Sequence, residues 1–231
     1  ATSDPMVVTA YGWTSRDLGS TWEPRVGAVQ LPQPGKLRGA GWGGLLFHRR
    51  LHALADGSVG GTMYGNYASD GDWYRSVWVR SVDLGAHWDV VATIASGPAG
   101  TEGYGEPVTA ICPNNWVLAV IRTGPGQPMR QARSADGGRT WERPQELGLG
   151  GWGWDPDLLA TPHGVVLSYG EHDYVHLASS QDCGGSWQHL ADLHVPTTSG
   201  YSGLALISGR LWVFTDTDRE TTIRGYPVEF P

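Results

Sequence analysis

The sequence predicts an all-β fold, a β-propeller built from four-stranded antiparallel blades. Three observations support this prediction: an octapeptide of the form Ser-x-Asp-x-Gly-x-Thr-Trp recurs along the chain, glycine occurs 34 times, and charged residues make up only 17%. No stretch carries apolar residues at sustained helical spacing, which favours many short strands joined by turns. With a length of 231 residues, the chain suits one sizeable core, so residues 1–231 are expected to form a single propeller domain.

The octapeptide occurs four times without gaps, and each copy is expected to close a hairpin. The copies span residues 15–22, 81–88, 134–141 and 180–187. In each copy an Asp carboxylate can accept backbone N–H groups across a tight turn, a Gly supplies a positive φ, and a Trp packs between neighbouring sheets. Residues repeated in every blade solve a problem that every blade has, so these Asp residues are interpreted as structural and not as catalytic acids.

The strand pattern around each copy predicts a β-meander in which the octapeptide joins the third strand to the fourth. The intervals between copies lie near or above the roughly 40 to 50 residues of propeller blades. The two ends do not complete this pattern, because one strand precedes the first copy and three follow the last. Either the terminal segments share one blade, which gives about five blades, or N-terminal blades are missing from the sequence.

Composition excludes several classes of partner. The formal charge of -7 is spread along the chain, without the basic stripe that a nucleic acid requires, and the longest apolar runs are strand-sized, so no membrane span is predicted. Cys112 and Cys183 lack the spacing of a zinc site, so no metal or cofactor is expected. The two cysteines form either a disulfide or free buried thiols. Because the sequence opens at Ala1 without a leader pattern, a secretion signal was either removed or never present; we expect a secreted or extracellular protein.

The octapeptide resembles the Asp-box, also called the BNR repeat, and the chain resembles the sialidase (neuraminidase) superfamily over nearly its whole length. That resemblance implies a six-bladed propeller if N-terminal blades are missing. The repeat alone does not imply an enzyme, because similar repeats occur in sorting receptors, assembly factors and several glycan-degrading propellers.

Three further positions resemble the catalytic pattern of sialidases. Glu106 opens a predicted inner strand in the segment Gly-Glu-Pro, Arg122 ends the next strand, and Tyr201 opens the inner strand of the last unit. The resemblance implies that Tyr201 is the nucleophile, Glu106 its base and Arg122 a ligand of the substrate carboxylate. A neutral Tyr suits a sugar with a carboxylate on its anomeric carbon, since that carboxylate would repel an Asp or Glu nucleophile.

Four other residues are predicted to bind substrate. Trp154 and Asp155 open an inner strand and could stack on and hydrogen-bond a sugar ring, although ordinary blade packing explains them as well. Glu171 and His172 occupy the stretch in which the family places another arginine. The sequence departs from the family here, so the arginine clamp is at most partial.

Three functions follow from these residues. The leading hypothesis is a sialidase-like glycoside hydrolase that acts on a terminal acidic sugar. The alternatives are a non-catalytic carbohydrate-binding or scaffold propeller, and a propeller polysaccharide lyase in which Tyr and His act as acid and base on a uronic acid. All three predict a glycan partner, and none specifies an oligomeric state.

Overall fold

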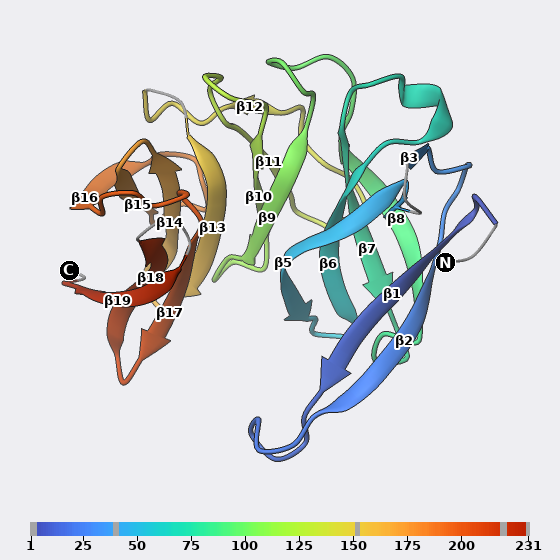
Figure 1. Ribbon diagram of the computed structural model, residues 1–231, viewed down its shortest axis with the longest axis horizontal. Coiled ribbons are helices and arrows are strands. Elements are labelled where there is room, and N and C mark those ends of the chain that lie inside the picture. The colour runs from blue at the N-terminus through green and yellow to red at the C-terminus, as the bar shows by residue number, and fades with distance from the viewer. Residues whose placement is uncertain (1–3, 39–41, 151–152, 218–220, 230–231) are drawn as a thin grey trace.

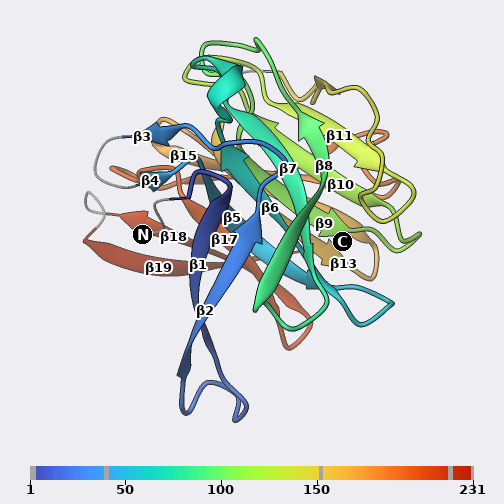
Figure 2. The same ribbon diagram turned by 90° about the vertical axis from the view of Figure 1, so that its right-hand side faces the viewer.

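The computed structural model describes residues 4–38, 42–150, 153–217 and 221–229, and in this part of the chain the regular structure is almost entirely β. One short 3-10 helix, η2 (Ala68–Asp70), interrupts the strands. Small antiparallel sheets follow one another along an arc, in the arrangement of propeller blades (Figures 1 and 2). No helix in the described part of the chain is long and apolar enough to cross a membrane.

The first blade consists of β5 (Leu45–Ala53), β6 (Val59–Gly65), β7 (Arg75–Ser81) and β8 (His87–Ala95). The second consists of β9 (Gly105–Ile111), β10 (Val117–Arg122), β11 (Arg130–Ser134) and β12 (Gln145–Glu146). The third consists of β13 (Trp154–Thr161), β14 (Gly164–Glu171), β15 (Tyr174–Ser180) and β16 (Gln188–His194). The fourth sheet has three strands, β17 (Ser202–Ile207), β18 (Arg210–Thr217) and β19 (Thr222–Val228).

The N-terminal strands β1 (Val7–Thr14) and β2 (Glu23–Gln30) form a hairpin whose second strand pairs in parallel with β8. This pairing extends the first blade to a six-stranded sheet. A separate two-stranded sheet joins β3 (Leu37–Arg38) to β4 (Trp42–Gly43). The terminal segments therefore do not share a blade among the described residues, since β19 pairs with β18 and the N-terminal hairpin with β8.

The four octapeptides adopt one local geometry, as predicted. Three of them join the third strand of a blade to the fourth, and the first joins β1 to β2 of the N-terminal hairpin. In the copy between β11 and β12, the Asp136 carboxylate accepts the Thr140 N–H at 2.9 Å and the Thr140 hydroxyl at 2.6 Å. The Ser134 hydroxyl donates to Asp136 at 2.8 Å and accepts the Gly138 N–H at 2.8 Å. Equivalent bonds form in the other three copies. The Asp carboxylates thus accept hydrogen bonds from the donors of the turn, which confirms their structural role.

In the second and third blades, the Trp of the Asp-box packs toward the preceding sheet, whereas Trp88 meets Phe47 of its own blade and Trp22 is exposed. Trp141 of the second blade lies 6.2 Å from Trp78 of the first, measured between ring centroids. The indole N–H of Trp187 in the third blade donates to Gln131 of the second at 2.9 Å. Buried apolar clusters fill the spaces between the first and second, second and third, and third and fourth sheets. These clusters hold the inner strands at fixed positions around the axis.

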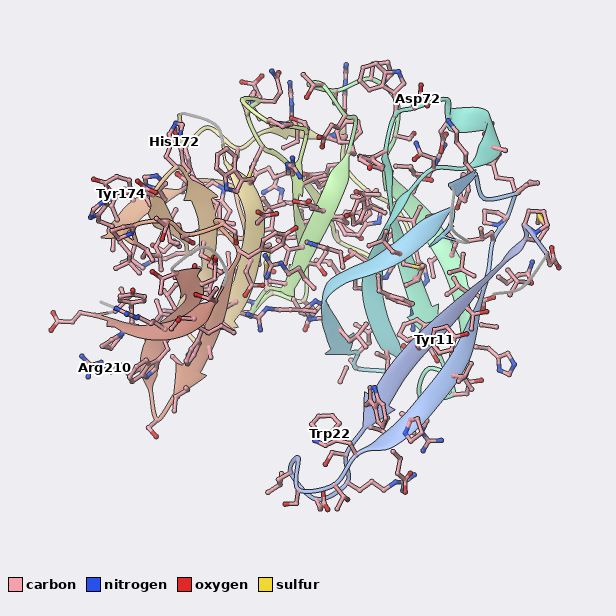
Figure 3. All side chains as sticks on the ribbon, viewed as in Figure 1. Tyr11, Trp22, Asp72, His172, Tyr174 and Arg210 are labelled. Atoms are coloured by element: carbon pink, nitrogen blue, oxygen red, sulfur yellow. A yellow bond between two sulfur atoms is a disulfide. The ribbon has the colours of Figure 1, made fainter. Side chains whose placement is uncertain are left out.

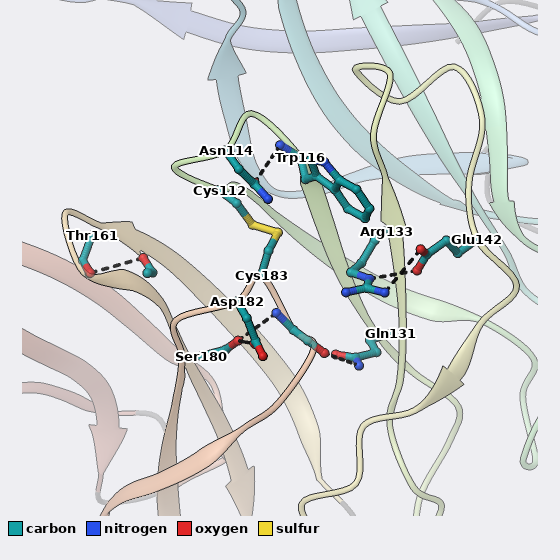
Figure 4. Close-up of a disulfide and its surroundings, with 12 residues drawn as sticks. Cys112, Asn114, Trp116, Gln131, Arg133, Glu142, Thr161, Ser180, Asp182 and Cys183 are labelled. Carbon is teal, nitrogen blue, oxygen red and sulfur yellow. Dashed lines mark hydrogen bonds and ion pairs between the residues drawn. A yellow bond between two sulfur atoms is a disulfide. The ribbon is translucent and has the colours of Figure 1, made fainter.

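Cys112 and Cys183 form a disulfide between the second and third blades (Figure 4). Cys112 directly follows β9, and Cys183 lies in the Asp-box turn after β15. Both cysteines belong to the cluster between these blades and are buried. The disulfide resolves the alternatives left open by the sequence. It is consistent with an extracellular protein, because such bonds persist in oxidising compartments.

Candidate active site

The first strands of successive sheets, β5, β9, β13 and β17, contact one another around the axis of the arc. In three of them the register shifts at a β-bulge. Within the described strands, the non-glycine residues with positive φ are the bulge residues of these strands: Arg49 at 61°, Glu106 at 47° and Asp155 at 54°. Such backbone geometry is unfavourable for a side-chain-bearing residue and clusters at functional sites, where it aims a side chain. Three successive blades thus direct a charged residue toward one centre.

Glu106 is buried and held by an arginine of the neighbouring strand. Its Oε1 accepts Arg122 Nη1 at 2.7 Å, while Nη2 of the same guanidinium lies 3.5 Å from Glu102. Burial opposes the charge of Arg122, but the two carboxylates outweigh this effect and raise its pKa. The second oxygen of Glu106, Oε2, is buried without a hydrogen-bond partner among the described residues. One side of this carboxylate is therefore fixed and the other is available to a further group.

Asp155 lies next to Glu106 and is also buried, with 5% of its surface exposed. Burial raises the pKa of the Asp155 carboxyl to about 8, and hydrogen bonding and charge repulsion from Glu106 add to this effect. The Tyr201 hydroxyl and the charge of Arg122 act in the opposite direction. Near neutral pH, Asp155 therefore retains a proton beside Glu106. The two carboxyl groups form one acid–base unit.

Tyr201 borders this carboxyl pair and reaches solvent, with 48% of its surface exposed. Burial of the hydroxyl and the nearby charges of Glu106 and Asp155 raise the pKa of Tyr201 above its usual value. The guanidinium of Arg49 lies 5.3 Å from the centre of the Tyr201 ring. Arg49 also donates to the carbonyl oxygens of Ser202 at 2.9 Å and Asp155 at 3.1 Å. It thus connects the first blade to β13 and to β17, which begins directly after Tyr201.

A second ion pair joins the inner strands. Arg50 donates to Asp157 through Nε at 2.9 Å and through Nη2 at 2.5 Å, and also to the Leu204 carbonyl at 2.6 Å. Asp157 accepts the Leu204 N–H at 2.8 Å in addition. Three inner strands, β5, β13 and β17, are therefore joined through one buried carboxylate.

Two aromatic residues that were not predicted from the sequence, Tyr64 and Tyr74, also border this site. Tyr64 of β6 has a pKa of about 12, raised chiefly by burial and then by Glu106. Its ring meets Tyr74 at 5.4 Å between centroids and at an angle of 78°. Neither tyrosine belongs to a motif, so only the packing of the first blade against β9 reveals them. Asp155 could have been assigned to the acid–base centre, because it precedes a proline at the start of an inner strand, as Glu106 does.

The structure brings together four of the seven predicted residues, Glu106, Arg122, Asp155 and Tyr201. Trp154 adjoins this group, because its indole ring packs against Gly200, which directly precedes Tyr201. A Cβ added to Gly200 would lie 2.1 Å from the indole nitrogen of Trp154. The Trp154 ring lies 6.1 Å from that of His172, which is an exposed turn residue at the end of the third blade (Figure 3).

Glu171 lies elsewhere, with its carboxylate 3.7 Å from His176 Nε2 on β15. His176 also contacts Asp192 at 2.6 Å, so Glu171 belongs to a polar group on the third blade and not to the carboxyl pair. The described residues contain no cluster of three or more His, Cys, Asp and Glu side chains suited to a metal ion.

The blades, their Asp-box turns and the charged inner strands define an Asp-box propeller with a candidate catalytic centre at its axis. The chain belongs to the family of BNR repeat-like domains, whose model matches residues 2–202. No curated protein matches the sequence.

Solved structures with this fold include proteins of different activity. A Dyadobacter fermentans protein of unknown function is 19% identical, with a TM-score of 0.67 over 97% of this chain and 73% of its own. An α-L-arabinanase from Penicillium chrysogenum, in complex with arabinobiose, is 18% identical, with a TM-score of 0.69 over 98% and 68%. The NanB sialidase of Streptococcus pneumoniae is 18% identical, with a TM-score of 0.65 over 94% of this chain but only 35% of its own. At these identities the likeness establishes the fold.

Proposed function

We propose that the protein is a glycoside hydrolase that removes a terminal sugar at the propeller axis, with Tyr201 as the nucleophile. The observation that carries the proposal is the electrostatic coupling of Tyr201 to Asp155 and Glu106, whose charges raise the pKa of the tyrosine. A tyrosine needs a neighbouring base to become nucleophilic, and this pair provides one within reach of its hydroxyl. Secretion is part of the proposal, since extracellular glycans are the natural substrates of such an enzyme and the disulfide agrees with that location.

The spacing of the two carboxyl groups argues against their acting on opposite sides of the substrate. Retaining glycosidases separate such groups by about 5 to 5.5 Å, and inverting enzymes by about 6.5 to 9.5 Å. Glu106 adds to the raised pKa of Asp155 through both hydrogen bonding and charge, so we place the two groups together on one side of the substrate. Tyr201 is half exposed and is therefore the member of the group best placed to reach an anomeric carbon.

In the proposed reaction, the Tyr201 oxygen forms a bond to the anomeric carbon as the glycosidic C–O bond breaks. The tyrosine proton passes to the Asp155–Glu106 pair, and the departing oxygen takes a proton from water. The hydroxide left by that water then attacks the same carbon and releases the sugar, and the pair returns its proton to the Tyr201 oxygen. Arg122 keeps Glu106 oriented throughout, because it is bonded to the opposite carboxylate oxygen.

The proposal extends the sialidase-like hypothesis to a terminal acidic sugar, for which a tyrosine nucleophile is suited. One observation favours a neutral sugar as a second candidate: Arg49, Arg50 and Arg122 all donate to oxygens of the protein itself. A substrate carboxylate would have to share these donors. The arabinanase with the same fold acts on a neutral sugar polymer, which makes an α-L-arabinofuranoside the natural comparison.

Release of 4-methylumbelliferone from a sialoside and from an α-L-arabinofuranoside tests the proposal. Tyr201→Phe removes only the hydroxyl and is expected to lower turnover by at least about a hundredfold, within the range that nucleophile and acid–base groups contribute. Tyr174→Phe, on the exposed part of the third blade (Figure 3), should retain full activity. Full activity of Tyr201→Phe, or no turnover of either glycoside by a wild type that binds glycans, would reject the hydrolase.

A further inference from the structure

Tyr64 borders the active site on the side of the first blade. It lies near the end of β6, and its ring packs against residues that precede two of the bulges. The ring centroid lies 5.6 Å from that of His48, which directly precedes Arg49, and the two rings are nearly perpendicular at 89°. A Cβ added to Gly105, which directly precedes Glu106, would lie 3.7 Å from Cδ2 of Tyr64. The ring is therefore held between the bulge of the first blade and that of the second.

Tyr64 and Tyr201 approach the carboxyl pair from opposite ends of the arc. Glu106 and Asp155 stand on β9 and β13, and Figure 1 shows β6 and β17 on either side of these two inner strands. Burial raises the pKa of Tyr64 to about 12, and the charges of Glu106 and Asp155 add to this effect. Glu106, Asp155 and Tyr64 in turn raise the pKa of Tyr201, after burial. The carboxyl pair thus has a tyrosine hydroxyl within electrostatic range on each side.

A hydroxyl across the site from the nucleophile is where a glycosidase needs a proton donor. The nucleophile attacks one side of the sugar ring, and an acid on the other side protonates the departing oxygen and later activates a water. Because the pKa of Tyr64 is about 12, its hydroxyl keeps its proton near neutral pH and can donate it. A side chain that is positioned to transfer this proton typically accelerates the reaction by about 10² to 10⁴-fold.

We infer, given the hydrolase proposed above, that Tyr64 is its acid–base residue and carries the proton that passes from water to the departing oxygen. As the glycosidic C–O bond breaks, the Tyr64 hydroxyl gives its proton to the departing oxygen. The Tyr64 oxygen then takes a proton from a water. The hydroxide that remains attacks the anomeric carbon, breaks its bond to the Tyr201 oxygen and releases the sugar. One water is consumed, and Tyr64 ends with the proton that it had at the start.

Charge couples this transfer to the activation of the nucleophile. The negative charge of Glu106 opposes loss of the proton from Tyr64. When the carboxyl pair accepts the proton of Tyr201, that negative charge is neutralised, and the Tyr64 hydroxyl becomes a stronger acid. This happens as the departing oxygen needs a proton. When the pair returns its proton to Tyr201, the pKa of Tyr64 rises again and its hydroxyl is retained.

The dependence of the rate on the leaving group tests this role on the full chain. Tyr64→Phe removes only the hydroxyl and keeps the ring against Gly105. For the methyl glycoside of the sugar that the wild type cleaves, kcat/KM should fall by roughly a hundredfold or more. For the 4-methylumbelliferyl glycoside, whose leaving group departs without a proton, kcat/KM should change little. Its kcat should fall and a burst equal to the enzyme concentration should appear, because activation of the water is slowed.

Tyr67→Phe is the matched control. Burial raises the pKa of Tyr67 to about 12 as well, but the charges that act on it are those of Arg75 and Asp70 and not those of the carboxyl pair. Its hydroxyl has no hydrogen-bond partner among the described residues. Tyr67→Phe should therefore fold normally and retain full activity on both glycosides.

The wild type provides a second measurement that needs no variant. Across aryl glycosides of increasing leaving-group pKa, its kcat/KM should decline only slightly, because an internal acid assists departure. A steep decline in the wild type, or an equal loss or no loss on both glycosides in Tyr64→Phe, would overturn the role of Tyr64. Loss of turnover in Tyr201→Phe would in that case leave the hydrolase standing. A wild type that cleaves no glycoside would reject the hydrolase and the role of Tyr64 together.

Discussion

The carboxyl groups of Asp155 and Glu106 meet across neighbouring inner strands, and their contact adds to the burial that raises the pKa of Asp155 to about 8. Each stands on a β-bulge and each has a positive φ. The strain in these two bulges is maintained by the packing of the second and third blades, which the disulfide also joins. The folded protein thus buries two neighbouring acids although burial and Glu106 both oppose the charged form of Asp155.

The raised pKa predicts how stability depends on pH. A carboxyl whose pKa is higher in the folded protein stabilises the fold below its unfolded value, near about 3.9, and this contribution is lost as the pH rises through the folded value. Asp155→Asn has no charge to bury, so its stability relative to the wild type should increase from about pH 4 to about pH 8.

Urea unfolding of the two proteins across this range measures the difference. Asp89→Asn serves as the control, because Asp89 is an exposed carboxyl on β8. A difference in stability that does not change with pH would contradict the assigned pKa.

The Asp-box carboxylates have the opposite pH dependence. Hydrogen bonds from Thr21 and its backbone lower the pKa of Asp17 to about 2, and equivalent bonds lower the pKa of Asp136 further. These groups stabilise the fold above the unfolded pKa, and their contribution is lost as the pH falls toward about 2. Asp136→Ala should lower the melting temperature at neutral pH and leave catalysis by the folded fraction unchanged. A variant of normal stability that had lost substrate turnover would assign Asp136 to the active site instead.

The ion pair between Arg50 and Asp157 should be essential to the inner ring. The Asp157 side chain is only 4% exposed, and removal of one partner leaves a buried charge without compensation, which typically costs about 3 to 5 kcal/mol. We therefore expect Arg50→Met to lower the free energy of unfolding by an amount in this range. Chemical denaturation measures it, with Arg16→Met in the exposed Asp-box turn as control. A loss no larger than that of the control would show that the pair is not a main support of the ring.

The disulfide should stabilise the second and third blades against unfolding. It closes a loop across a sequence separation of 71, and cross-links of this kind typically contribute roughly 2 to 4 kcal/mol. The double variant Cys112→Ser with Cys183→Ser should therefore unfold at lower denaturant concentration than the wild type. Addition of a thiol reductant should shift the wild type toward the variant and leave the variant itself unchanged. Equal midpoints for the wild type, the reduced wild type and the double variant would show that the bond contributes no net stability.

The repeat determined the fold. Each octapeptide contains the complete set of donors and acceptors for its own turn, so Ser134, Asp136 and Thr140 satisfy one another within a few residues. Because this chemistry is local, the sequence was sufficient to predict all four turns.

The candidate site could be predicted only in part, since its chemistry depends on distant segments. The sequence singled out Glu106, Arg122 and Tyr201 through their resemblance to a family pattern, and it placed Asp155 at the start of an inner strand. It could not show that Asp155 meets Glu106, since burial and a contact between two blades cause the raised pKa. The grouping of Glu171 with His176 is equally a consequence of strand pairing in the third blade. Local hydrogen bonds are encoded by neighbouring residues, whereas the raised pKa of Asp155 requires the packing of whole sheets.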